Sequence, residues 1–159
     1  MSCPVLVLGC SDRPAGMPAL YPCKITITQE DAPLVDASVV LSNISDPALG
    51  DTWSAAGRTD SSGVAVIQTN GQYAGAPGGT YKIIVEKINT ESAKFGPRPP
   101  AGTPELVDWE DKTAFDTTIS RVILVEPLYS SSSTPHEIEV KKGNNDVSID
   151  VGKAVKIKR

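Results

Sequence analysis

The chain has 159 residues, of which 40% are hydrophobic and only 5% are aromatic. This length supports one hydrophobic core of ordinary size, so a single domain is expected. The formal net charge of -4 argues against a broad electropositive surface, and no nucleic-acid partner is predicted. The basic end of the chain, residues 152–159, is interpreted as a solvated tail.

The N-terminal segment is similar to the cleavage junction of a bacterial lipoprotein. Apolar residues 5–8 precede a glycine and Cys10, and in that pattern the cysteine is lipidated after signal cleavage. The apolar run is short and follows no basic residue, so an apolar edge strand is the alternative. Prolines and glycine in residues 11–22 predict an extended tether. We therefore assign residues 1–22 to a signal remnant and tether. The protein is expected to be extracytoplasmic, either secreted or held in the cell envelope by lipid alone, since no segment is long enough to span a bilayer.

The three cysteines leave two interpretations open. If Cys10 carries lipid, Cys3 is removed with the signal, and Cys23 is left as a small buried hydrophobe at the start of a strand. If the chain is not lipidated, Cys10 and Cys23 could form a disulfide. No residue spacing matches a zinc site, so neither a metal nor another cofactor is predicted.

Alternation of apolar and polar residues with a period of two predicts an all-β domain over residues 23–151. At its start, for example, Cys23, Ile25 and Ile27 alternate with polar residues. Turn residues separate the alternating runs, as expected for a single β-sandwich of seven to eight short strands. The predicted strands are 23–29, 36–42, 53–59, 64–69, 80–87, 121–126, 137–142 and 146–151.

Two neighbouring features of this domain make specific predictions. The turn Asp60-Ser61-Ser62-Gly63 predicts a tight hairpin, in which Gly63 is free to adopt a positive φ. The strand 64–69 that follows is apolar on both faces. Such a strand usually lies centrally or is covered, so Val64 and Val66 are expected beneath an inserted loop.

The second half of the domain contains an insertion and a closing hairpin. Alternation stops in residues 89–120, which are interrupted by proline and glycine and are expected to form an irregular, exposed insertion. Within it, Pro104 is expected to begin a short helix running towards Ala114, with Leu106, Trp109 and Phe115 turned inward. The turn at 143–146 predicts that the last two strands pair with each other.

Three motifs resemble those of carboxypeptidase regulatory-like domains. They are Pro33-Leu34 with Ala37-Ser38-Val39, then Thr59-Asp60-Ser61-Ser62-Gly63, then Ala76-Pro77-Gly78-Gly79-Thr80-Tyr81-Lys82-Ile83. The later motifs Leu128-Tyr129-Ser130 and Glu139-Val140-Lys141-Lys142-Gly143 are similar to the ending of short secreted lipoproteins of this type from Planctomycetes and Lentisphaerae. The resemblance covers residues 21–87 best, and it implies a transthyretin-like (prealbumin-like) sandwich of Greek-key type. It implies no ligand, since one fold hosts many functions.

The residue types argue against enzymes that use related sandwiches. The chain holds one histidine, His136. Transthyretin-like hydrolases of the purine pathway use several histidines, and intradiol dioxygenases hold iron with two histidines and two tyrosines. No Gly-x-Ser-x-Gly motif supplies a nucleophile for which His136 would be the base. His136 is therefore interpreted as a surface or strand-start residue, and the protein is predicted not to be an enzyme.

An acidic cluster in the insertion is the best candidate for a metal site. Asp108, Glu110 and Asp111 offer the hard oxygen ligands that suit calcium. They lack the glycine-punctuated spacing of a dedicated calcium loop, and acidic loop residues are usually solvated. No metal is therefore assigned, and these three residues stay a weak candidate.

Two functions are compatible with this sequence. A non-catalytic structural or adhesion module would present residues 89–120 to a partner protein or an envelope polymer. Alternatively, Trp53, Tyr73 and Trp109 would form an aromatic platform that binds carbohydrate, although core packing is the commoner role of such residues. Exposed strand edges would also permit self-association by β-augmentation.

Overall fold

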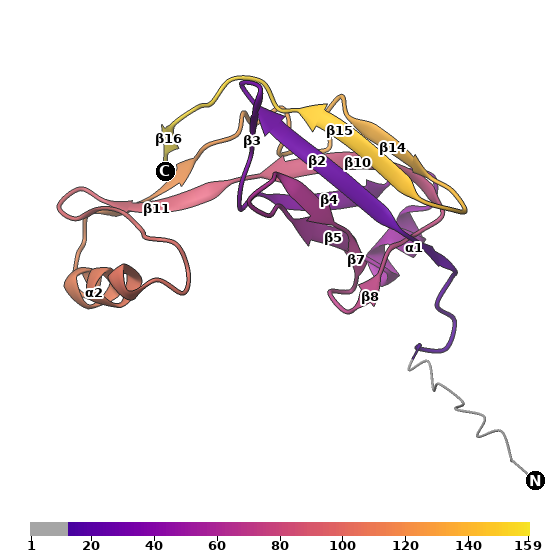
Figure 1. The fold of residues 1–159 in the computed structure, drawn as a ribbon, viewed down its shortest axis with the longest axis horizontal. Helices are drawn as coiled ribbons and strands as arrows, with labels where there is room; N and C mark the ends of the chain where they lie inside the picture. The colour runs from indigo at the N-terminus through magenta and orange to yellow at the C-terminus, as the bar shows by residue number, and fades with distance from the viewer. Residues whose placement is uncertain (1–12) are drawn as a thin grey trace, which may run out of the picture.

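The structure is a computed structural model that describes residues 13–159 (Figure 1). Cys10 and the segment similar to a lipoprotein cleavage junction lie outside the described residues. Strands account for 43% of the structure and helices for 11%. The prediction of an all-β chain is therefore confirmed.

Most of the described strands belong to two sheets, and one short strand pair lies beside them. The six-stranded sheet has the order β14 (Glu137–Val140), β10 (Gly79–Glu86), β4 (Ser38–Asn43), β5 (Ala55–Arg58), β7 (Gln68–Thr69) and β8 (Tyr73–Ala74). The other has the order β15 (Asn145–Asp150), β2 (Cys23–Gln29) and β3 (Ala32–Pro33), with β6 (Val64–Val66) also paired to β2. The short pair joins β1 (Leu20–Tyr21) to β9 (Ala76–Pro77). These elements are called the body.

One hydrophobic core joins the sheets of the body. Strand β2 turns Cys23, Ile25 and Ile27 inward, as the alternation predicts, and β10 contributes Ile83 and Val85 from the facing sheet. All five side chains are buried. Because aliphatic residues from the two sheets belong to one cluster, burial of apolar surface is what holds the sheets together.

A second unit, the arm, leaves the body where β10 ends (Figure 1). After Lys87 the chain continues as β11 (Ile88–Ser92), in a sheet of order β12 (Gly96–Pro97), β11, β13 (Ile119–Ile123) and β16 (Ile157–Lys158). Helix α2 (Pro104–Thr113) lies at the outer end of the arm. The predicted short helix is confirmed, whereas the expectation of an irregular insertion is wrong, since β11, α2 and β13 give this segment regular structure.

The predicted strand 64–69 is divided between the two sheets. Its first part, β6, pairs with β2, and its last part, β7, pairs with β5. The chain therefore crosses from one sheet to the other at Ile67, which is fully buried. Val66 points outward and is 53% exposed. The prediction of a covering loop over Val66 is therefore wrong.

The predicted closing hairpin is also wrong. Strand β14 pairs antiparallel with β10, and β15 pairs parallel with β2, so the two strands belong to different sheets. The Asn145 side chain stabilises the turn between β14 and β15. Its Oδ1 accepts a hydrogen bond from Lys141 N at 2.9 Å, and its Nδ2 donates one to Lys141 O at 2.9 Å. Both strands still turn apolar residues such as Ile138 and Ile149 into the shared core. Alternation alone is equally compatible with either pairing.

Two more segments differ from expectation. Residues 47–52 form helix α1 (Pro47–Thr52), because Asp46 caps its first turn by accepting from Leu49 N at 3.1 Å. The strand expected from residue 53 consequently begins at Ala55. At the other end of the chain, β16 pairs with β13, so residues 152–159 are not simply a solvated tail.

Candidate functional site

The three aromatic residues proposed as a sugar platform do not share a surface. Trp109 lies in α2, is only 8% exposed, and donates from Nε1 to Gly96 O at 3.3 Å. Trp53, which caps the C-terminus of α1, and Tyr73 of β8 are half-buried, and these elements lie at the opposite end of the molecule from α2 (Figure 1). Trp109 therefore packs α2 onto the arm and offers no stacking face to a ligand.

The acidic residues proposed as calcium ligands do not converge. Asp108 contacts Lys112 at 2.6 Å, and Glu110 contacts Arg98 at 2.8 Å. Asp111 is exposed on the same helix. Within residues 13–159, no group of three or more acidic, histidine or cysteine side chains is arranged to hold a metal ion.

His136 and Cys23 have structural surroundings. The His136 ring stacks on Tyr129 with 5.4 Å between ring centroids, and its Nε2 lies 2.9 Å from Asp150 O. Cys23 is a free thiol buried in the core of the body. Burial, with a smaller contribution from the Asp146 charge, raises the pKa of this thiol to about 11. At neutral pH the sulfur is therefore protonated and a poor nucleophile.

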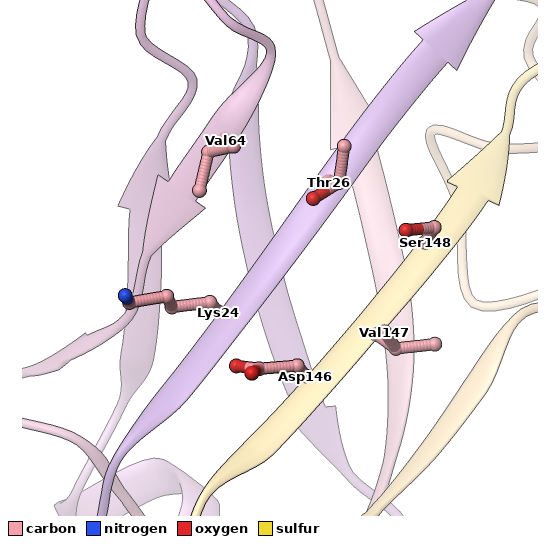
Figure 2. A pocket seen from close by; sticks show the side chains of 6 residues that line it. All are labelled: Lys24, Thr26, Val64, Asp146, Val147 and Ser148. Carbon is pink, nitrogen blue, oxygen red and sulfur yellow. The ribbon is translucent and has the colours of Figure 1, made fainter.

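A shallow hollow of about 330 Å³ lies on the outer face of the parallel strand pair (Figure 2). Lys24 of β2 and Asp146 of β15 are register partners there, and Val64 of β6 borders them. The remaining lining residues are Thr26, Val147 and Ser148. One lysine beside one aspartate in an open hollow does not amount to a catalytic arrangement.

The arm has a second hollow, where it joins the body. This hollow of about 190 Å³ is lined by two isoleucines, two arginines and one glutamate: Ile88, Ile123, Arg121, Arg159 and Glu86. Register explains the grouping, because Ile88 lies opposite Ile123. Arg121 and Arg159 exchange two backbone hydrogen bonds, of 3.2 and 2.9 Å, so their side chains share one face of the sheet.

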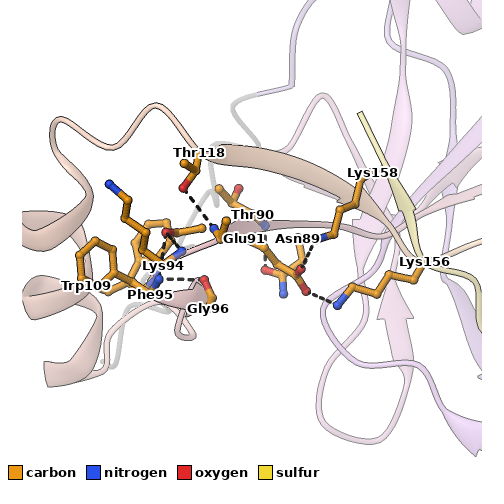
Figure 3. Close-up of polar contacts among 12 residues, drawn as sticks. Asn89, Thr90, Glu91, Lys94, Phe95, Gly96, Trp109, Thr118, Lys156 and Lys158 are labelled. Carbon is orange, nitrogen blue, oxygen red and sulfur yellow. Dashed lines mark hydrogen bonds and ion pairs between the residues drawn. The ribbon is translucent and has the colours of Figure 1, made fainter.

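The opposite face of the arm sheet has a different electrostatic character (Figure 3). Glu91 of β11 contacts the Nζ atoms of Lys156 and Lys158 at 2.9 and 3.7 Å. The hydrogen bond from Lys156, with the charges of both lysines, lowers the pKa of the Glu91 carboxyl below its ordinary value. On this face, both lysines therefore contact one carboxylate.

The outer end of the arm is held by polar contacts around one carboxylate. Asp116 accepts a short hydrogen bond from Ser92 Oγ, and its Oδ1 accepts from Thr118 N at 2.8 Å and Thr118 Oγ1 at 2.7 Å. Ser92 Oγ in turn accepts from the backbone of the turn that follows β11. Beyond this network, two apolar side chains project into solvent: Val107 is 63% exposed and Phe115 is 99% exposed. The expectation that Phe115 turns inward is therefore wrong.

Sequence reasoning missed both basic residues of the arm hollow. A weak signal for a strand was present, because Lys156 and Lys158 alternate with Ile157 and Arg159. The interpretation of residues 152–159 as a solvated tail overlooked this alternation. The position of Arg121 opposite Arg159 follows only from the register of β13 and β16.

No helix within residues 13–159 has the length and apolar character needed to cross a membrane. Comparison of the chain with protein-family models, with curated proteins and with solved structures found no match.

Proposed function

We propose that this protein is a non-catalytic binding module of the cell envelope or extracellular space, in which the body holds the arm out towards a partner. The observation that carries the proposal is the exposure of Val107 and Phe115 beyond the end of the arm sheet. Neither side chain belongs to the core of the body. Burial of these side chains by a partner would remove apolar surface from water, which favours association.

The partner is a protein or an envelope polymer, and neither nucleic acid nor a cofactor is required. The net charge of -4 disfavours nucleic acid. Association with a membrane would depend on lipidation of Cys10, and open strand edges such as that of β15 would permit self-association. We further propose that the two sheets of the body form a transthyretin-like sandwich of Greek-key type, as in carboxypeptidase regulatory-like domains. The shared core of the two sheets supports this proposal.

Replacement of the outer part of the arm tests the proposal. Ser92 and Ile119 are register partners, so an Asn-Gly turn can replace residues 93–118 while leaving β11 paired with β13. The variant and its parent are prepared in a Cys10→Ser background, fluorescently labelled, and titrated onto isolated cell envelopes of the encoding organism. We expect saturable binding by the parent and at least a tenfold loss for the variant.

A matched control distinguishes binding through the arm from non-specific hydrophobic adsorption. Val66→Ser removes an exposed apolar side chain from the body and should bind envelopes like the parent. Equal binding by the arm replacement and its parent, with both proteins folded, would overturn the proposed function. Lipid anchoring is tested separately: the full-length precursor should fractionate with membranes, and Cys10→Ser should release it.

A further inference from the structure

The basic residues of β16 are divided between two faces of the arm. Lys156 and Lys158 point to the face that carries Glu91 and are paired with it (Figure 3). Arg159 points to the other face, beside Arg121. Within residues 13–159, neither guanidinium has an acidic partner. On one face both lysines therefore contact a carboxylate, and on the other face neither arginine does.

Two arginines directly across an antiparallel strand pair oppose folding of the strand that carries them. Their Cα atoms are about 5.5 Å apart in such a hydrogen-bonded pair, and like charges placed opposite each other are destabilising. A carboxylate placed between Arg121 and Arg159 would remove the repulsion and could accept bidentate hydrogen bonds. This pair is therefore suited to an anionic group supplied by a ligand.

The rest of the hollow restricts what that ligand can be. Ile88 and Ile123 form an apolar floor, and Glu86 lies at the body end. Glu86 is four residues before Thr90, which is the register partner of Arg121. Four residues of extended chain span about 13 Å. The hollow therefore has an anion at one end, an apolar middle, and two cations at the other end.

We propose that this hollow binds an extended peptide segment in which an apolar side chain lies between an acidic and a basic residue, each two positions away. The acidic residue contacts Arg121 and Arg159, the apolar side chain packs on Ile88 and Ile123, and the basic residue contacts Glu86. This inference rests on the proposed function that the arm binds a partner, and it adds a second contact surface at the base of the arm. An anionic lipid surface fits less well, since Glu86 would repel it. A sugar fits less well, since the floor has no aromatic ring.

Selection from a phage-displayed library of linear 12-residue peptides tests the inference on the full chain. We expect enriched clones to share the acid, apolar and base pattern at two-residue spacing. Their binding should fall at least tenfold for the variant Arg121→Gln with Arg159→Gln. The matched control, Lys142→Gln with Lys153→Gln, removes the same charge from exposed lysines outside the hollow and should bind these clones within twofold of the parent.

Inversion of the charges makes the test more specific. The triple variant Glu86→Lys, Arg121→Glu and Arg159→Glu should enrich peptides with acid and base exchanged in position. Because the substituted side chains are exposed at the rim, each variant should melt within a few degrees of the parent. The inference is overturned if no clone is enriched, or if the enriched clones bind the double arginine variant as well as the parent.

Two further outcomes distinguish this inference from related ideas. Vesicles of phosphatidylglycerol and phosphatidylcholine should not co-sediment the Cys10→Ser protein; arginine-dependent co-sedimentation without peptide selection would identify a lipid site and overturn the peptide proposal. Replacement of residues 93–118 leaves the hollow in place. If that replacement abolishes envelope binding while the arginine variant binds peptides normally, the proposed function stands and only this inference fails.

Discussion

The body and the arm are both built from β-sheet, but different forces hold them together. Aliphatic side chains from two sheets bury one another in the body. In the arm, Val122 and Trp109 are the large apolar side chains that the described structure buries, and neither belongs to that core. Hydrogen bonds and ion pairs around Asp116 and Glu91 supply much of the remaining cohesion. Because the lysines of these pairs are exposed to solvent, which weakens an ion pair, we expect the arm to open before the body does.

The largest difference should come from truncating one isoleucine in each unit. Ile83 is fully buried in the body, and Ile83→Ala should lower the free energy of unfolding by about 2–5 kcal/mol through lost burial and a residual cavity. Ile88 in the arm is 38% exposed, and Ile88→Ala should cost below about 1 kcal/mol. Urea denaturation monitored by circular dichroism measures both. Similar losses for the two variants would contradict a division of stability between the units.

A pair of glycines separates backbone strain from crowding in the body. Gly63 has φ of +76°, as predicted from the turn sequence, and an added Cβ would lie 2.6 Å from Ile27 O. Gly71 also has a positive φ, +68°, but nothing lies within 4 Å of its Cβ position. Gly63→Ala should therefore cost about 1–3 kcal/mol, and Gly71→Ala distinctly less. Equal melting temperatures for the two variants would show that crowding against β2 is unimportant.

Removing the indole of the arm should have a local effect. Trp109→Ala deletes the buried contact between α2 and the arm sheet, including the bond to Gly96 O. We expect hydrogen exchange over residues 96–113 to accelerate at least tenfold, while exchange in β2 and β10 is unchanged. Val107→Ala, which alters an exposed side chain of the same helix, is the matched control. Acceleration throughout the body would contradict the independence of the two units.

The features that could be predicted from sequence were the local ones. The alternating residues of 23–29 specify β2, and four turn residues specify the positive φ of Gly63. Strand partners were not predictable, because alternation identifies the buried face of a strand without identifying its neighbour. Helix α1 was missed for a related reason: Asp46 before a proline favours a turn and a helix start equally.

The same limit applies to the candidate site. The three candidate residues are all aromatic, but Trp53 and Tyr73 lie at one end of the fold and Trp109 lies at the other. Arg121 and Arg159 carry no sequence motif, and only the pairing of β13 with β16 places them side by side. Single candidate residues could therefore be named from the sequence, but the groups of residues that the fold brings together could not.

Acid should loosen the outer end of the arm before it affects the body. Hydrogen bonds from Ser92, and then from Thr118, lower the pKa of Asp116 below its ordinary value. A carboxylate with a depressed pKa contributes stability above its unfolded pKa, and this contribution is lost as the pH falls through the folded pKa. Protection factors of residues 92–119 should therefore decrease on acidification, while those of β2 persist. Asp116→Asn should remove this dependence; unchanged acid sensitivity in that variant would assign the effect to another group.

The smallest effect should come from the buried thiol of the body. The pKa of Cys23 is raised from 9.0 to about 11, so between these values an unfolded chain loses the thiol proton before the folded chain does. Stability should consequently fall slightly as the pH rises through this range, and Cys23→Ala should remove that part of the dependence. At pH 8, iodoacetamide should modify Cys23 only after denaturation, as measured by mass spectrometry of the peptide that contains it. Rapid modification of Cys23 in the folded protein would show that the start of β2 opens readily, and the body would then share the local mobility expected of the arm.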